Sequence, residues 1–162
     1  MKFLVFLLLS FGLIADDIDG FWKTIDEKTG KPRCVVGIYE YDGMYYGRII
    51  STYNEDGTFK ESIYAPKERA PGVIGNPFYC GLDFILYLMP ASSSYKGKIM
   101  DPEHGKIYNA ELWTEGDNLI VRGKLLMFGR NQTWLPVSKE DFPKDFKMPD
   151  LSTFKPTIPQ VK

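Results

Sequence analysis

Apolar and polar side chains alternate with a period of two residues through most of the chain, from about residue 21 to residue 137. This period is typical of β-strands with one buried face. The clearest case flanks Asp42-Gly43, a dipeptide that favours a two-residue hairpin turn. The sequence therefore predicts a hairpin between residues 33–41 and residues 44–52.

The two faces of this hairpin differ in polarity. The drier face, which we expect to point into the protein, carries Cys34, Val36, Ile38, Tyr45, Gly47 and Ile49. The opposite face carries Tyr39, Tyr41, Tyr46 and Arg48. A shift of the pairing by one residue would exchange the faces, so the pattern also specifies the register: Tyr41 opposite Met44 and Ile38 opposite Gly47.

The same short pattern recurs further along the chain. The motif Tyr45-x-Gly47-x-Ile49 is repeated by Tyr95-x-Gly97-x-Ile99, Tyr108-x-Ala110-x-Leu112 and Leu119-x-Val121-x-Gly123-x-Leu125. With further turns at residues 101–105 and 115–118, residues 16–137 predict an all-β domain, an antiparallel up-and-down β-barrel of about eight strands. We expect the small interior residues Gly47, Gly97, Ala110 and Gly123 to leave space inside.

Two segments depart from this pattern. Residues 53–79 form a long loop with three prolines, which we expect either to lie across one mouth of the barrel or to cover a sheet edge. Residues 82–89, which follow, are apolar on both faces and predict a strand covered on both sides. Residues 138–162 contain four prolines and mixed charges, so we expect an extended and loosely ordered C-terminal tail.

The N-terminus predicts the cellular compartment. Met1-Lys2 precedes an almost unbroken apolar run, residues 3–14, which Ala15 closes. This arrangement is typical of a secretory signal peptide over residues 1–15. The alternative is a membrane anchor, but spanning a bilayer takes about 20 apolar residues. We therefore expect a soluble mature chain from residue 16, periplasmic or secreted, with no integral membrane segment.

Composition and charge exclude several functions. The chain has 162 residues, with 20 Lys and Arg against 21 Asp and Glu, and lacks the basic footprint of a nucleic-acid partner. Its single histidine, His104, lies in a turn-forming stretch, which excludes most zinc sites and histidine-based catalysis. Phosphate-binding and serine-nucleophile motifs are also absent from the sequence. We expect no enzymatic activity and no cofactor.

Cys34 and Cys80 are the only cysteines. In an oxidising compartment such a pair forms a disulfide when the geometry permits. The alternative is two buried thiols that pack as small apolar groups. The sequence leaves both open.

Several motifs resemble known barrel families. Gly20-Phe21-Trp22 resembles the Gly-x-Trp start of the lipocalin and related calycin barrels, in which an arginine on the last strand packs across the tryptophan and closes one end. Arg130 has the matching place in Gly129-Arg130-Asn131-Gln132-Thr133-Trp134. The Thr-Asp-Tyr element of typical lipocalins is not present.

A longer series of motifs is more specific. It includes Tyr46-Gly47-Arg48-Ile49, Cys80-Gly81-Leu82, Gly97-Lys98-Ile99-x-Asp101-Pro102 and Leu119-x-Val121-Arg122-Gly123. Over about residues 19–137 the chain resembles a family of small exported bacterial proteins, known mainly as a domain of unknown function with a lipocalin-like barrel. The resemblance implies an exported β-barrel that carries a small hydrophobic ligand, closed at one end by Trp22 and Arg130.

Two hypotheses for function follow. In the first, the barrel binds a small hydrophobic or amphipathic ligand through its interior residues, and tyrosine hydroxyls hold the polar end of that ligand. The candidates are Val36, Ile38, Tyr45, Ile49, Tyr95, Ile99, Tyr108, Leu112, Leu119, Val121 and Leu125. The alternative use of the same residues is a solid core. In the second hypothesis, the outward tyrosines Tyr39, Tyr41 and Tyr46 form, with the tail, an exposed surface for a protein or envelope partner.

Overall fold

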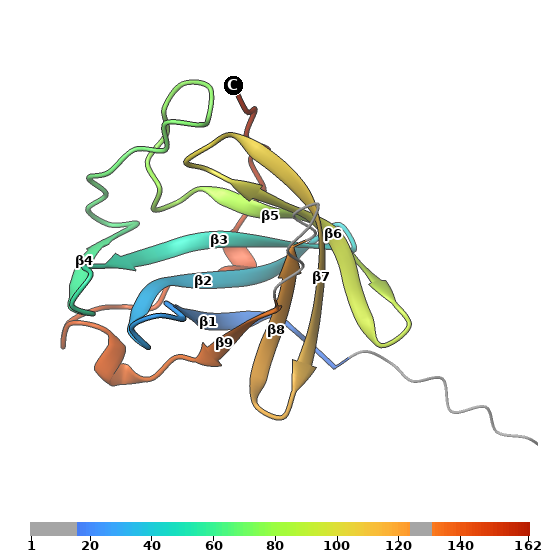
Figure 1. The fold of residues 1–162 in the computed structure, drawn as a ribbon, viewed down its shortest axis with the longest axis horizontal. Helices are drawn as coiled ribbons and strands as arrows, with labels where there is room; N and C mark the ends of the chain where they lie inside the picture. The colour runs from blue at the N-terminus through green and yellow to red at the C-terminus, as the bar shows by residue number, and fades with distance from the viewer. Residues whose placement is uncertain (1–15, 124–130) are drawn as a thin grey trace, which may run out of the picture.

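The structure, a computed structural model, describes residues 16–123 and 131–162. The predicted signal peptide, Leu125 and Arg130 lie outside the described residues. The described strands are β1 (Gly20–Ile25), β2 (Pro32–Tyr41), β3 (Met44–Tyr53), β4 (Phe59–Ser62), β5 (Asp83–Ala91), β6 (Ser94–Asp101), β7 (Lys106–Glu115), β8 (Asn118–Gly123) and β9 (Asn131–Pro136), as Figure 1 shows.

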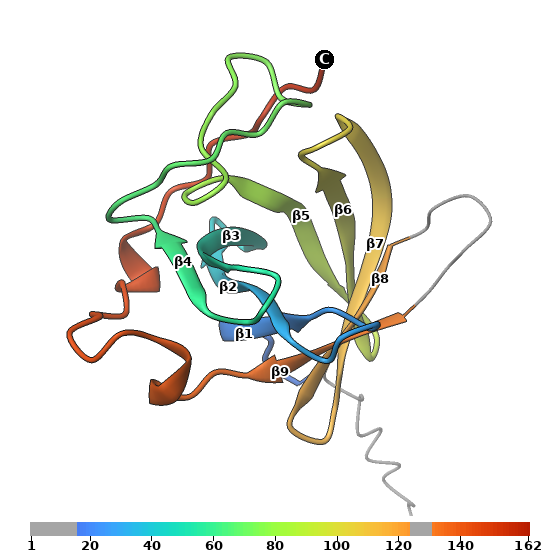
Figure 2. The same ribbon diagram turned by 60° about the vertical axis from the view of Figure 1, so that its left-hand side comes forward.

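The strands form a closed antiparallel barrel. Their hydrogen-bonded order is β2-β1-β9-β8-β7-β6-β5-β3-β4, and an additional pairing of β2 with β3 closes eight of them into a ring. The ninth strand, β4, pairs only with β3 among the described strands and lies beside the ring (Figure 2). Apart from the excursion to β4, each strand pairs with the next one along the chain, which confirms the predicted up-and-down barrel.

The predicted hairpin forms with the predicted register. Tyr41 pairs with Met44 and Ile38 pairs with Gly47. Asp42 and Gly43 have φ angles of 50° and 79°, the left-handed conformation that a tight hairpin turn requires at both positions. The turns at residues 101–105 and 115–118 also lie where the sequence predicts them, between β6 and β7 and between β7 and β8.

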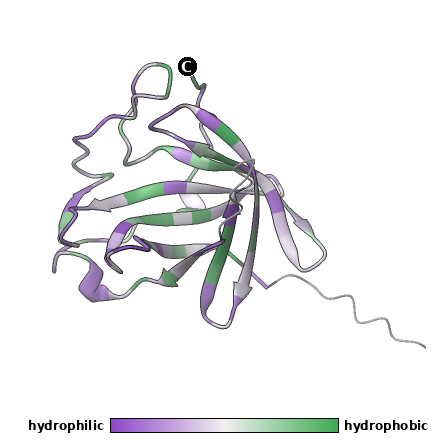
Figure 3. Cartoon of the chain, in the orientation of Figure 1, coloured by the Kyte–Doolittle hydropathy of each residue, from purple (hydrophilic) through white to green (hydrophobic). Residues whose placement is uncertain are grey.

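The alternating pattern fills the barrel with apolar side chains. Hydrophobic and polar stretches alternate along the strands in Figure 3. The largest buried cluster includes Val36, Ile38, Leu112, Leu119 and Val121, which all point inward as predicted. The strand predicted to be covered on both sides is β5. Its first four residues are buried, but Tyr87 and Met89 are 42% and 55% exposed, so the prediction is wrong at these two positions.

Two of the small interior residues have a different role from the one predicted. A Cβ atom on Gly47 would lie 2.9 Å from Ile85 Cβ, and one on Gly97 would lie 2.6 Å from the carbonyl oxygen of Leu86. These glycines therefore allow neighbouring chain segments to approach each other closely. The expectation that they leave space inside is wrong at these positions.

The C-terminal tail is extended, as predicted, apart from two short 3-10 turns, η1 (Lys139–Asp141) and η2 (Leu151–Thr153). Figure 2 shows it running outside β2 and β3 and ending beside the loop that follows β4. The Lys23 ammonium contacts the Asp141 carboxylate at 2.6 Å, and the Tyr53 hydroxyl donates to the Asp141 carbonyl at 2.7 Å. The expected loose order is wrong, because the tail packs along the barrel wall.

The tail also covers the outward tyrosines. Tyr39 and Tyr46 are 2% and 3% exposed, and Tyr41 is half-buried. The Phe154 ring meets the Tyr39 ring edge-on at 5.3 Å. The direction predicted for these side chains is right, but the prediction that they are exposed is wrong. The buried Tyr39 and Tyr46 therefore do not support the interaction hypothesis, which stays a prediction.

Candidate ligand-binding cavity

A cavity of about 590 Å³ opens at one end of the barrel. Most of its buried lining is apolar and includes Ile49, Phe84, Val121 and Trp134. The rings of Phe84 and Trp134 lie 6.3 Å apart at an interplanar angle of 31°. These four side chains come from β3, β5, β8 and β9, so the cavity exists only because the barrel is closed.

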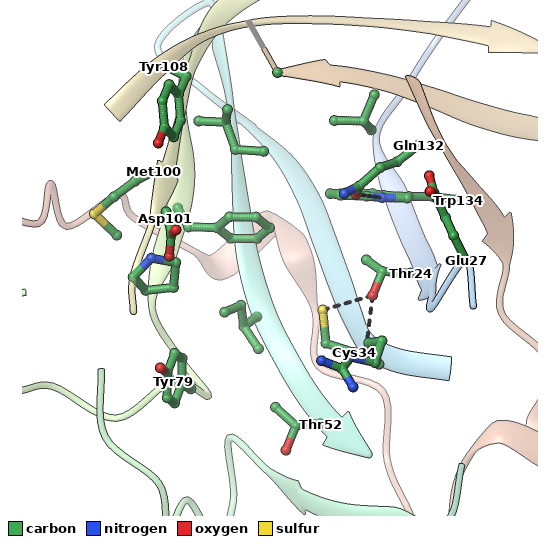
Figure 4. A pocket seen from close by; sticks show the side chains of 17 residues that line it. Thr24, Glu27, Cys34, Thr52, Tyr79, Met100, Asp101, Tyr108, Gln132 and Trp134 are labelled. Atoms are coloured by element: carbon green, nitrogen blue, oxygen red, sulfur yellow. Dashed lines mark hydrogen bonds between the residues drawn. The ribbon is translucent and has the colours of Figure 1, made fainter. Parts of the chain in front are cut away.

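The rim of the cavity is polar. In Figure 4, one side carries Tyr108, Asp101 and Tyr79, and the other side carries Gln132, Thr24 and Cys34. The Trp134 indole N–H donates to Gln132 Oε1 at 3.1 Å. This bond uses the acceptor end of the amide, so the Gln132 NH₂ group is the end that can donate to a ligand.

Both cysteines are free thiols. Cys34 lines the cavity, and its sulfur lies 3.3 Å from the Thr24 hydroxyl. Burial raises the pKa of Cys34 to about 11 and that of Cys80 to about 12. Each thiol therefore stays protonated near neutral pH and is a poor nucleophile.

The strand order explains why the two cysteines do not bond. Cys34 on β2 pairs with Thr52 on β3, whereas Gly81, next to Cys80, donates to the Ile49 carbonyl on β3 at 2.7 Å. Strand β3 thus lies between the two cysteine backbones. Two strand spacings amount to about 9–10 Å, beyond the Cα separation of about 7 Å that a disulfide tolerates. Of the two alternatives that the sequence leaves open, the structure has the buried thiols.

The rim carries charges that already have partners. Arg33 lies 3.7 Å from Asp26. Asp101 accepts hydrogen bonds from the backbone of Glu103 and from the backbone and ring of His104. Although burial acts in the opposite direction, the His104 bonds lower the pKa of Asp101 below its usual value. His104 therefore stabilises the β6–β7 turn, as the sequence predicts.

The cavity continues into a polar groove of about 510 Å³. The two hollows share Arg33, Thr52, Tyr79, Asp101 and Pro102. Burial raises the pKa of the Tyr79 phenol, and the nearby carboxylates of Glu103 and Asp101 raise it further. Together the hollows offer an apolar interior and a polar exit.

Only some of the predicted ligand-binding residues line this cavity. Ile49, Ile99, Tyr108 and Val121 do. The others pack in the core away from it: Val36, Ile38, Tyr45, Tyr95, Leu112 and Leu119. The rings of Tyr45 and Tyr95 contact each other at 5.1 Å, so of the three predicted tyrosines only Tyr108 faces the cavity.

Other lining residues were not predicted. Phe84 and Trp134 lie on predicted strands, but Phe84 belongs to the stretch that is apolar on both faces and Trp134 is followed by Leu135, so alternation does not single them out. Tyr79 lies in the long loop, where no periodicity indicates which way a side chain points. Trp22 is half-buried against the core, with its indole N–H donating to the Ile18 carbonyl at 2.9 Å.

Comparisons with known proteins agree with this architecture. A family model described as an uncharacterised protein conserved in bacteria, DUF2147, matches residues 20–135. The chain belongs to the DUF2147 family. No curated protein sequence matches it significantly.

A solved structure is similar to this DUF2147 protein in fold. It is protein HP1028 from the human pathogen Helicobacter pylori, which is described as belonging to the lipocalin family. The two chains are 23% identical, the match covers 77% of this chain and 86% of HP1028, and the TM-score is 0.59. The lipocalin-like barrel is therefore shared.

Two further observations concern other classes of site. Within residues 16–123 and 131–162, no group of three or more His, Cys, Asp or Glu side chains is placed to hold a metal ion. In the same part of the chain, no helix is long and apolar enough to cross a membrane.

Proposed function

We propose that this DUF2147 protein is an exported binding protein that holds one small hydrophobic or amphipathic molecule in its barrel and does not transform it. The cavity of about 590 Å³ carries this proposal. Its size lies within the range of about 300–1,000 Å³ that is usual for small-molecule sites, and an apolar interior with few polar groups is their usual lining.

The shape of the hollow orients the ligand. The apolar part of the ligand lies against Phe84, Val121 and Trp134. The polar part of the ligand reaches the exit, where Tyr79, Tyr108 and Gln132 offer hydrogen bonds. A purely apolar molecule would leave these groups to water at the open end, at little cost. The site therefore accepts both kinds of molecule.

Binding without catalysis fits the state of the polar groups. The Cys34 thiol is protonated, and Asp101 is occupied by its own turn. The apolar N-terminal segment supports export, which fractionation of cells that express the full chain tests directly: the proposal requires the protein outside the cytoplasm.

The binding test is native mass spectrometry of protein purified from its own cells, followed by organic extraction of the bound material. Val121 lies at the bottom of the cavity and is 2% exposed, so Val121→Trp fills the cavity. Ile107 on β7 is 45% exposed, and Ile107→Trp adds a similar bulk on the surface as the matched control.

We expect an added mass that the wild-type protein and the Ile107→Trp variant retain and the Val121→Trp variant loses. The fluorescent probe N-phenyl-1-naphthylamine provides a second readout: we expect the wild-type protein and Ile107→Trp to bind it more tightly than Val121→Trp does. The proposal is wrong if the wild-type protein carries no added mass and the probe does not enter it.

A further inference from the structure

The loop beside the cavity mouth is a compact unit with its own hydrogen bonds. This mouth loop, residues 68–79, is closed by the Ala70 N–H donating to the Pro77 carbonyl at 2.8 Å and by the Tyr79 N–H donating to the Glu68 carbonyl at 3.0 Å. Tyr79, at its base, lines both the cavity and the polar groove. Its position therefore determines how wide the exit is.

The tip of the mouth loop is joined to the β6–β7 turn, which lies on the same side of the cavity as Tyr79. The Gly72 N–H donates to the Pro102 carbonyl at 2.9 Å. A Cβ atom on Gly72 would lie 2.2 Å from the backbone nitrogen of Gly105, so the tip and the β6–β7 turn are in close contact. Pro102 also lines the cavity. The tip is thus connected to two lining residues on this side of the mouth, Tyr79 through the loop and Pro102 through the hydrogen bond.

The end of the C-terminal tail holds this tip. The Ile74 N–H donates to the Gln160 carbonyl at 2.7 Å, and the Lys162 N–H donates to the Gly72 carbonyl at 3.0 Å. Val161 forms an antiparallel bridge with Val73. The Lys162 ammonium adds a hydrogen bond to Asn76 Oδ1 at 2.6 Å. We call residues 158–162 the latch.

The latch is anchored separately from the rest of the tail. The Thr157 N–H donates to the buried Asp83 carboxylate at 2.9 Å, and Arg48 donates to the Lys155 carbonyl at 2.7 Å. These contacts fix the tail up to residue 157 on the barrel wall, so the latch can detach without releasing the remainder.

A second cavity, of about 480 Å³, lies between the mouth loop and the latch. Pro77 and Phe78 line it from the loop side, and Ile158 and Pro159 line it from the tail side. Phe78 and its neighbour Tyr79 thus face different hollows. The second cavity leaves space beside Phe78, and Tyr79 follows Phe78 in the chain.

From this arrangement we infer that the latch controls the rate at which a ligand enters and leaves the barrel. While residues 158–162 hold the tip, the mouth is narrow; when they detach, the mouth loop moves and the exit widens. The latch holds the tip through two backbone hydrogen bonds and the bond from Lys162 to Asn76, and Val161 packs beside the buried Val73. A short terminal segment with this few bonds opens among the low-energy local motions of a protein. The inference rests on the proposed ligand binding.

The test compares exchange kinetics of N-phenyl-1-naphthylamine in stopped-flow experiments. A chain that ends at Thr157 lacks the latch and keeps the anchors on Arg48 and Asp83. We expect its association and dissociation rates to rise roughly tenfold together, with a much smaller change in affinity, because the latch does not touch the cavity. Lys155→Ala is the control. Arg48 bonds to the backbone carbonyl of Lys155, which this substitution preserves.

A second variant pair acts in the opposite direction and preserves the chain length. Val73→Cys together with Val161→Cys places two thiols at the β-bridge, where Cα atoms lie close enough for a disulfide. Oxidised with diamide, this protein should exchange the probe several-fold more slowly than after reduction. If the shortened chain fails to fold, this comparison decides.

The outcomes separate the two proposals. If no protein binds the probe or carries a ligand, the proposed function fails. If the wild-type protein binds the probe but neither loss of the latch nor its covalent closure changes the exchange rates, the latch inference is overturned and the proposed function stands.

Discussion

The buried carboxylate of Asp83 gives the sharpest prediction about stability. Its side chain is fully buried and accepts hydrogen bonds from the Tyr39 hydroxyl at 2.8 Å and from Arg48 Nε and Nη2 at 3.0 and 2.8 Å. It also accepts the Thr157 N–H at 2.9 Å. The variant Asp83→Asn keeps the volume, removes the charge and leaves the Arg48 guanidinium largely buried without its partner.

The expected cost is large for a single substitution. Breaking a buried ion pair by removing one partner costs about 3–5 kcal/mol. For a domain of this size, 1 kcal/mol lowers Tm by roughly 3 °C, so we expect a fall of about 10–15 °C. Because Asp83 also binds the tail, the same variant should make residues 154–162 more susceptible to proteolysis.

Urea unfolding followed by tryptophan fluorescence measures the free energy, and calorimetry measures Tm. Glu68→Gln is the matched control. It removes the carboxylate of an exposed ion pair, in which the Lys60 side chain is 31% exposed and the Glu68 side chain 53%. Such a pair contributes about 0–1 kcal/mol to stability. A double-variant cycle with Arg48→Gln isolates the coupling, which should exceed about 1 kcal/mol. A loss for Asp83→Asn no larger than that of the control would refute this reasoning.

Two further predictions concern titration. A hydrogen bond with Asp17, together with burial, raises the pKa of Asp19 to about 6. The folded state therefore favours the protonated Asp19 carboxyl. This contribution to stability is lost as the pH rises from about 4 to about 7. The stability of Asp19→Asn should therefore increase relative to wild type across that pH range, by at most about 1 kcal/mol because the group is exposed. Urea titrations at several pH values measure this. A difference in unfolding free energy that stays constant with pH would contradict the prediction. At pH 8 the thiols of Cys34 and Cys80 should react with iodoacetamide at least 100-fold more slowly in native protein than in urea, because burial raises both pKa values. Equal rates would disprove the buried-thiol state. An intact mass two hydrogens lighter, which indicates a disulfide, would disprove it as well.

The barrel could be predicted because its determinants are local. Asp42-Gly43 fixes one hairpin turn, and the alternation beside it fixes which face points inward, so the pairing of Ile38 with Gly47 follows from neighbouring residues. The repeated motifs extend the same argument to β6, β7 and β8. Closure of the ring by the β1–β9 pairing was expected only by analogy with related barrels.

The tail and the cavity could not be placed in this way, because they depend on distant contacts. Arg48 and Asp83 are 35 residues apart, and Arg48 and Lys155 are 107 residues apart. Outward tyrosines therefore look exposed in the sequence although Phe154 covers them. Periodicity likewise shows that Leu112 and Val121 point inward but does not show which end of the barrel is filled.

The packing of the tail has a consequence for biosynthesis. Synthesis runs from the N-terminus, so β1 to β9 are complete before Phe154, Thr157 and Val161 exist. Until those residues are available, Asp83 and Arg48 lack their backbone partners and the loop at residues 72–74 lacks its strand neighbour. These tail contacts therefore form after the barrel strands have been synthesised. A tag fused at Lys162 would lie next to the contacts that residues 158–162 make with the loop at residues 72–74.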